Sequence, residues 1–186
     1  MAALPMPYRF SVDDYYRMAE VGLLPPDVRT ELFEGEILQM APIGVRHAEC
    51  VNRFTMTFAR LFGDQAVVSV QNPVRLDNHS EPQPDVTLVR LRPDGRPLAH
   101  PTPSDVLLLV EVADSTLRFD RLRKAPAYAR TGVAEVWIVD VEARVIERYR
   151  DPADGTYRRV DTVAAGCAMS PAFCPDVAIS VDELIP

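Results

Sequence analysis

Lysine is almost absent from this chain. Of its 20 lysine and arginine residues only one, Lys124, is a lysine. An ammonium group is compact, can shift its pKa and can donate to a single oxygen, whereas a guanidinium forms a rigid planar fork. The sequence therefore singles out Lys124 as a position with distinct chemistry, and the chance placement of a single lysine is the alternative.

Cysteine and long apolar runs are also scarce. The three cysteines, Cys50, Cys167 and Cys174, form no short metal-ligand spacing and are odd in number, which argues against a zinc knuckle or a disulfide framework. No apolar run approaches the roughly 20 residues that a membrane span needs, and Met1 to Phe10 does not resemble a signal peptide. We expect a cytoplasmic protein with reduced thiols and no membrane partner.

The length and charge limit the organisation and the partners. A chain of 186 residues with 47% hydrophobic residues favours a single domain over residues 1–186. The net charge of -7 argues against sequence-blind adhesion to a polyanion. Residues 115–150 nevertheless carry eight basic and five acidic residues, a local balance of +3 (8 - 5). This stretch is either a nucleic-acid face or an ordinary solvated surface.

The apolar run from Val106 to Val110 predicts a buried strand, and Glu111 follows it directly. Because burying an unpaired carboxylate costs several kcal/mol, a strand of this kind is expected to meet a cation. A second strand opens with an acid at Asp85, and a predicted helix carries Lys124. Two carboxylates with a lysine are typical of a Mg²⁺ or Mn²⁺ site, in which the lysine orients water or stabilises a phosphate.

The residues alone leave an alternative open for three other assignments. Asp120 and Lys124 are four residues apart, so a surface ion pair is the simplest alternative for the lysine. His47 begins a predicted helix and has a capping role as its alternative. Glu31 is one of three nearby acids, for which a solvated loop is the default.

Periodicity and turn residues predict a mixed α/β sheet. Helices are expected at 11–22, at 46–62 and at 116–131, the last with a kink at Pro126 and an end at Gly132. Strands are expected over 36–40, 66–76, 85–89, 106–112, 135–140, 144–150, 156–163 and 177–180, with a hairpin turn at Asp154 and Gly155. A proline-rich surface loop is expected over 92–104.

An ordered set of motifs runs along the chain, namely ELFEGE at 31–36, His47, PDV at 84–86, VEV at 110–112, DST at 114–116, DxxxK at 120–124, YxxxGV at 128–133 and EVWIVD at 135–140. This set resembles the Uma2 (DUF820) family of the PD-(D/E)XK nuclease superfamily. The resemblance implies a restriction-endonuclease-like αβββαβ core. It also implies that Asp85 and Glu111 are metal ligands, that the carbonyl of Val112 is a further ligand, and that Glu31 and His47 line the catalytic site with Lys124.

The sequence departs from the superfamily pattern at Ala113, where a lysine would follow Glu111 by two residues. The resemblance implies that Lys124 supplies this amine from the helix. We therefore expect a Mg²⁺- or Mn²⁺-dependent DNA endonuclease that acts as a homodimer, because two sites cut two strands most simply. The alternatives are an inactive nucleic-acid-binding or regulatory module of the same fold, and a metal-dependent hydrolase with another substrate.

Overall fold

The structure, a computed structural model, describes residues 6–91 and 99–186, so most of the predicted proline-rich loop lies outside the described residues. Within these ranges no helix combines the length and the apolarity needed to cross a membrane. In chain order the elements are α1 (Val12–Glu20), β1 (Thr30–Phe33), β2 (Glu36–Gln39), α2 (Val45–Phe62), β3 (Ala66–Val70), β4 (Val86–Arg90), the 3₁₀ turn η1 (Pro103–Asp105), β5 (Val106–Ala113), α3 (Leu117–Phe119), the π-helical turn η2 (Asp120–Lys124), α4 (Ala125–Thr131), β6 (Glu135–Asp140), β7 (Val145–Ala153), β8 (Thr156–Ala164), β9 (Ala168–Met169), β10 (Ile179–Ser180) and α5 (Val181–Leu184).

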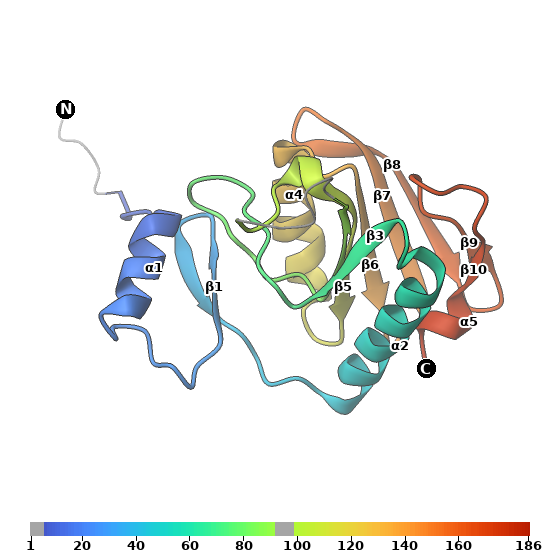
Figure 1. Ribbon diagram of the computed structural model, residues 1–186, viewed down its shortest axis with the longest axis horizontal. Helices are drawn as coiled ribbons and strands as arrows, with labels where there is room; N and C mark the ends of the chain where they lie inside the picture. Colours follow the sequence, from blue (N-terminus) through green and yellow to red (C-terminus); the bar gives the residue numbers. More distant parts are fainter. Residues whose placement is uncertain (1–5, 92–98) are drawn as a thin grey trace.

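Six strands form one mixed sheet in the order β3-β4-β5-β6-β7-β8 (Figure 1). Neighbouring strands are antiparallel except β5 and β6, which are parallel. A parallel pair needs a long crossover connection, and the segment α3-η2-α4 provides it. The predicted αβββαβ core is confirmed as α2, β3, β4, β5, this helical crossover and β6, with additional hairpins on either side.

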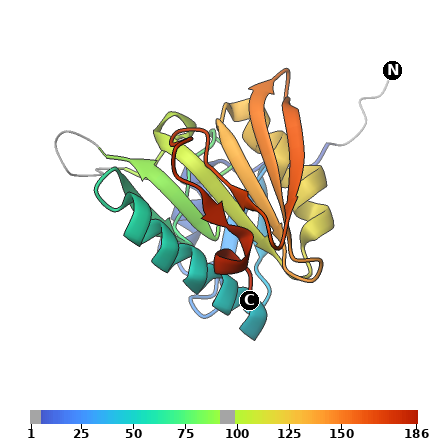
Figure 2. The same ribbon diagram turned by 90° about the vertical axis from the view of Figure 1, so that its right-hand side faces the viewer.

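The two faces of the sheet are covered by different helices, which lie on opposite sides of it in Figure 2. On one face Phe54 of α2 packs with the fully buried Trp137 of β6. On the other face Tyr128 of α4 shares a core cluster with Ile138. Successive side chains of a strand point to opposite faces, so Glu111, next to the α2-facing Val110, points towards α4.

The stretch around Gly35 forms a complete hairpin, whereas the sequence predicted only the second strand, over 36–40. Thr30 to Phe33 pairs with Glu36 to Gln39, and Glu34 and Gly35 form the turn with φ values of 50° and 74°. The first strand was missed because four residues with a single charged position give little alternating pattern. The hairpin and α1 together make up one end of the molecule (Figure 1).

The predicted irregularity at Pro126 takes the form of a π-helical turn just before it. Proline has no N–H, and its ring clashes with the carbonyl four residues earlier, here that of Leu122. The preceding turn is wider, with the Ala125 N–H donating to the carbonyl of Asp120. Within this turn Asp120 and Lys124 are both buried, so the surface ion pair considered for them is excluded.

Candidate active site

The five side chains predicted for the site lie around one cavity of about 390 Å³. They come from β1, the first turn of α2, the residue before β4, the end of β5 and the π-helical turn. The segment between β2 and α2, residues 40–44, also contributes to the cavity wall. The predicted members are Glu31, His47, Asp85, Glu111 and Lys124.

Asp85 is held by contacts to both of its carboxylate oxygens. The Val112 N–H of β5 donates to Oδ2 at 2.9 Å. Oδ1 lies 3.1 Å from Nε2 of His47 and accepts a hydrogen bond from the side-chain amide of Gln71 at 3.2 Å. Burial would raise the pKa of Asp85, but the contact with His47 and the Val112 N–H hold it below its ordinary value. Asp85 is therefore an ionised, oriented carboxylate.

Glu111 is the meeting point of two groups from the crossover helix. Lys124 Nζ donates to its Oε1 at 3.1 Å, and the hydroxyl of Tyr128 donates to the same oxygen. The Lys124 Nζ also lies 3.4 Å from Oε1 of Glu31, whose other oxygen accepts from the Gln83 N–H at 3.0 Å. The single lysine thus joins the β1 strand to the end of β5.

Negative charge exceeds positive charge in this buried cluster, which contains Glu31, Asp85, Glu111, Asp120 and Lys124, each no more than 8% exposed. Burial, opposed by Lys124 and reinforced by the neighbouring acids, raises the pKa of Glu111 to about 8. Burial also raises the pKa of Asp120. Burial would lower the pKa of Lys124, yet the adjacent glutamates hold it above its ordinary value, so the ammonium stays charged. Further positive charge would stabilise this arrangement.

The donor set fits a hydrated magnesium or manganese ion. No group of three or more His, Cys, Asp or Glu side chains in residues 6–91 and 99–186 could hold a metal ion alone. Mg²⁺ keeps several water ligands and commonly uses one or two carboxylates, and Asp85 and Glu111 border the same cavity. The carbonyl of Val112, whose N–H contacts Asp85, stays a predicted further ligand.

His47 lies in the site, where its imidazole is 15% exposed and contacts Asp85. The contact with Asp85 raises the pKa of the imidazole above its ordinary value, against the opposing effect of burial. Its Nδ1 atom is buried without a hydrogen-bond partner among the described residues. The imidazole therefore supports the orientation of the Asp85 carboxylate.

Comparison with known proteins identifies the family. A family model described as "Putative restriction endonuclease" matches residues 12–182. The chain belongs to the Uma2 family. A solved structure described as "a putative nuclease belonging to DUF820" from Anabaena variabilis ATCC 29413 superposes with a TM-score of 0.73, at 15% identity, over 94% of this chain and 97% of that chain. This likeness confirms the fold, while a search of curated proteins found no match.

Membership of the Uma2 family supports a nuclease at a coarse level, since the family description names restriction endonucleases. In this Uma2 chain the position two residues after Glu111 is a buried alanine, Ala113, as the sequence showed. The amine beside Glu111 comes instead from Lys124 on the crossover helix. Lys124 thus lies beside Glu111, and its role in catalysis stays a prediction.

Three residues of this Uma2 site were not assigned to it from the sequence. Gln71 contacts Asp85 from the irregular stretch after β3, where no pattern singles it out. Asp120 accepts a hydrogen bond from Thr116 at 2.6 Å. Tyr128 lies four residues after Lys124, one helical turn further on, and this spacing was the available signal for its contact with Glu111.

Proposed function

We propose that this chain is an endonuclease that hydrolyses phosphodiester bonds in DNA with Mg²⁺ or Mn²⁺ bound by Asp85 and Glu111. The observation that carries the proposal is the position of Lys124. Two buried carboxylates at adjacent strands of one sheet share a cavity with this lysine, whose Nζ lies 3.1 Å from Glu111. The Uma2 family description agrees with this reaction class.

The chain's own residues supply orientation and charge. Asp85 and Glu111 would hold the divalent ion, which would polarise the phosphate and lower the pKa of a bound water. Lys124 provides a positive donor beside the phosphate, where negative charge builds during attack. Glu31 also contacts the ammonium, at 3.4 Å. His47 and the Val112 N–H fix the two oxygens of Asp85.

DNA as the substrate and a homodimer as the active form are parts of the same proposal. The basic residues of 115–150 lie on the crossover helix, in the turn before β7 and on β7. Electrostatic attraction by these residues would bring the phosphate backbone to an otherwise acidic protein. Two copies would present two sites to the two strands of a duplex, and the cytoplasm is the expected location.

The test is cleavage of supercoiled plasmid, single-stranded DNA and RNA with Mg²⁺, with Mn²⁺ and with a chelator. Asp85→Asn, Glu111→Gln and Lys124→Met are each compared with the wild type. We expect metal-dependent DNA cleavage that each substitution abolishes. Undiminished cutting by all three variants would refute the assignment. DNA binding without turnover over the whole panel would favour the inactive binding module instead.

A further inference from the structure

Two hairpin turns of this protein have the same backbone shape but different residues. Glu34 and Gly35 have φ values of 50° and 74°, and Asp154 and Gly155 have φ values of 53° and 75°. Such a turn needs positive φ at both central positions, where Asn, Asp and Gly are preferred. Glutamate is not in that group, so the Glu34 backbone is strained and its side-chain contacts must offset the strain.

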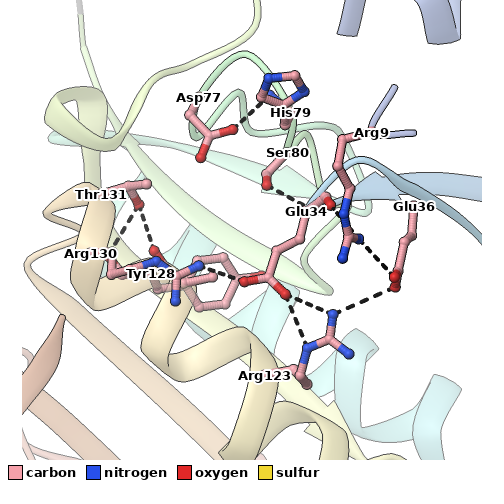
Figure 3. A network of polar contacts seen from close by, with 11 residues as sticks. Arg9, Glu34, Glu36, Asp77, His79, Ser80, Arg123, Tyr128, Arg130 and Thr131 are labelled. Atoms are coloured by element: carbon pink, nitrogen blue, oxygen red, sulfur yellow. Dashed lines mark hydrogen bonds and ion pairs between the residues drawn. The ribbon is translucent and has the colours of Figure 1, made fainter. Parts of the chain in front are cut away.

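The Glu34 carboxylate binds two arginines of the crossover helix (Figure 3). Arg123 donates to Oε2 from Nε at 3.0 Å and from Nη2 at 2.7 Å, and Arg130 donates to Oε1 at 2.6 Å. Burial would raise the pKa of Glu34, yet these arginines hold it below its ordinary value. The Asp154 side chain, by contrast, is 92% exposed and contacts Arg158 at 3.4 Å.

The two arginines bracket the part of the helix that serves the proposed site. Lys124 follows Arg123 directly, and Tyr128 lies between Arg123 and Arg130. In the hairpin, Glu31 belongs to β1 and lies three residues before Glu34. The Glu34 contacts therefore join the hairpin that carries Glu31 to the helix that carries Lys124.

The backbone of the turn has its own anchors. The Glu34 N–H donates to Oγ of Ser80 at 3.0 Å, and the Gly35 N–H donates to the carbonyl of His79 at 2.7 Å. A Cβ added to Gly35 would lie 2.6 Å from the Cβ of Arg9, so this position stays glycine. Replacing Glu34 by glycine removes the carboxylate and the strain while these anchors remain.

We propose that Glu34 is a positioning residue that holds Glu31 against Lys124 by fastening the β1–β2 turn to the crossover helix. The role of Glu34 in catalysis rests on the proposed function, whereas its effect on the position of Lys124 does not. Without the carboxylate, the hairpin and the helix are joined in this region by the 3.6 Å contact of Arg123 with Glu36, by the 3.4 Å contact of Lys124 with Glu31 and by packing such as that of Phe33 on Phe119. We expect the ammonium then to become accessible.

The chain's single lysine makes this expectation measurable. The purified proteins are treated with an amine-acetylating reagent, and acetylation of Lys124 is followed by mass spectrometry with the N-terminal amine as internal reference. Wild type and Asp154→Gly should react slowly, because Lys124 is 6% exposed and paired. Glu34→Gly and Glu34→Gln should react at least tenfold faster. A wild-type rate in both Glu34 variants would overturn the proposal.

Urea unfolding separates positioning from general loss of structure. Because glycine relieves the strain, Glu34→Gly should shift the urea midpoint no more than Asp154→Gly does. If Lys124 is acetylated faster only in variants whose urea midpoint also falls strongly, the proposal is overturned. Glu34→Gln, which keeps the backbone strain and loses the charge, should show the same acceleration, because its amide keeps one acceptor oxygen and sets an NH2 donor against the other arginine.

Cleavage assays distinguish the failure of this inference from the failure of the proposed function. If the wild type cuts DNA, Glu34→Gly should lower kcat about tenfold with KM little changed, since the binding surface is intact. Unchanged kcat and unchanged acetylation would refute the positioning role and leave the nuclease in place. If the wild type cuts nothing, the proposed function fails, and the acetylation rates still decide the position of Lys124.

Discussion

Two buried glutamates on neighbouring strands, Glu111 and Glu135, meet the same physical problem in different ways. Glu135 opens β6 and is fully buried, and burial raises its pKa. The indole N–H of Trp137 donates to one oxygen at 2.8 Å, and the Ala172 N–H donates to the other at 2.6 Å. Neutral, fixed donors satisfy this carboxylate, which ties the C-terminal segment to the sheet.

Glu111 lies near the opposite end of the parallel pair, towards the end of β5. Its oxygen Oε1 is bound by Lys124 and Tyr128, and further carboxylates lie around it at a cavity. Repulsion from the neighbouring carboxylates acts on Glu111, and no repulsion of comparable strength acts on Glu135. Burial alone therefore does not identify a functional acid. An excess of negative charge beside a cavity does.

The largest expected effect is on catalysis. Glu111→Gln should lower the rate of DNA cleavage on the order of 10³-fold, about 4 kcal/mol in activation free energy, because the site loses a charged ligand. Glu135→Gln should leave the rate within a few-fold of wild type. Single-turnover cleavage at saturating Mg²⁺ measures both. Equal losses in the two variants would erase the functional distinction between the glutamates.

The next effect concerns the balance of charge at the site. Lys124→Met should lower the free energy of unfolding by about 3 kcal/mol without metal, because the buried acids lose their cation. Added Mg²⁺ should restore a large part of that loss by supplying positive charge. Urea unfolding with and without Mg²⁺ measures the recovery.

A matched cation elsewhere provides the control for this recovery. Arg148 is a largely buried arginine that pairs with Asp161 on β8, away from the cavity lining. Arg148→Met should be destabilising, and Mg²⁺ should not restore its stability beyond the gain seen for wild type. A Mg²⁺ response of the same size in both variants would show that the recovery has no connection with the site.

Glu135 should matter for stability rather than for metal binding. Glu135→Ala leaves the Trp137 indole N–H and the Ala172 N–H without their acceptor, so the free energy of unfolding should fall by about 2 kcal/mol. The affinity for Mn²⁺ should equal that of wild type in isothermal titration calorimetry. A large loss of Mn²⁺ affinity with little loss of stability would reverse the roles assigned to the two glutamates.

The smallest effect is a pH dependence. Because the folded pKa of Glu135 lies above its ordinary value of 4.5, the folded state binds more protons than the unfolded state between these two values. The contribution of Glu135 is therefore fully present below about 4.5 and is lost as the pH rises through the raised pKa. Glu135→Gln should remove this slope, as urea unfolding of both proteins from pH 4 to pH 7.5 would show. Parallel pH profiles would contradict the shift.

Much of the fold was predictable because local patterns and tertiary packing agree. The helix over 46–62 and the buried strand before Glu111 have strong periodicity and are present within a residue or two of the predicted bounds. Pro126 and the Asp154-Gly155 turn were predicted from the fixed chemistry of proline and of type I′ turns. The hairpin around Glu34 was only half predicted, because the four residues of its first strand give little alternating pattern.

The site was predictable to the extent that unusual residues reveal it. Glu111 stood out as an acid after an apolar run, and Lys124 as a single lysine, and the structure brings them within 3.1 Å. Spacing alone could not show that the π-helical turn would direct Asp120 and Lys124 inward. The contact of Gln71 with Asp85 depends on a backbone with φ of 51°, which no periodic pattern encodes.

Isothermal titration of Mn²⁺ into the wild type, Asp85→Asn and Glu111→Gln tests the central claim most directly, namely that these two carboxylates hold one ion beside Lys124. We predict one ion per chain for the wild type and a loss of affinity of at least about tenfold in each variant, the scale seen when metal-site groups are removed. Mn²⁺ binding of wild-type strength in both variants would contradict the claim.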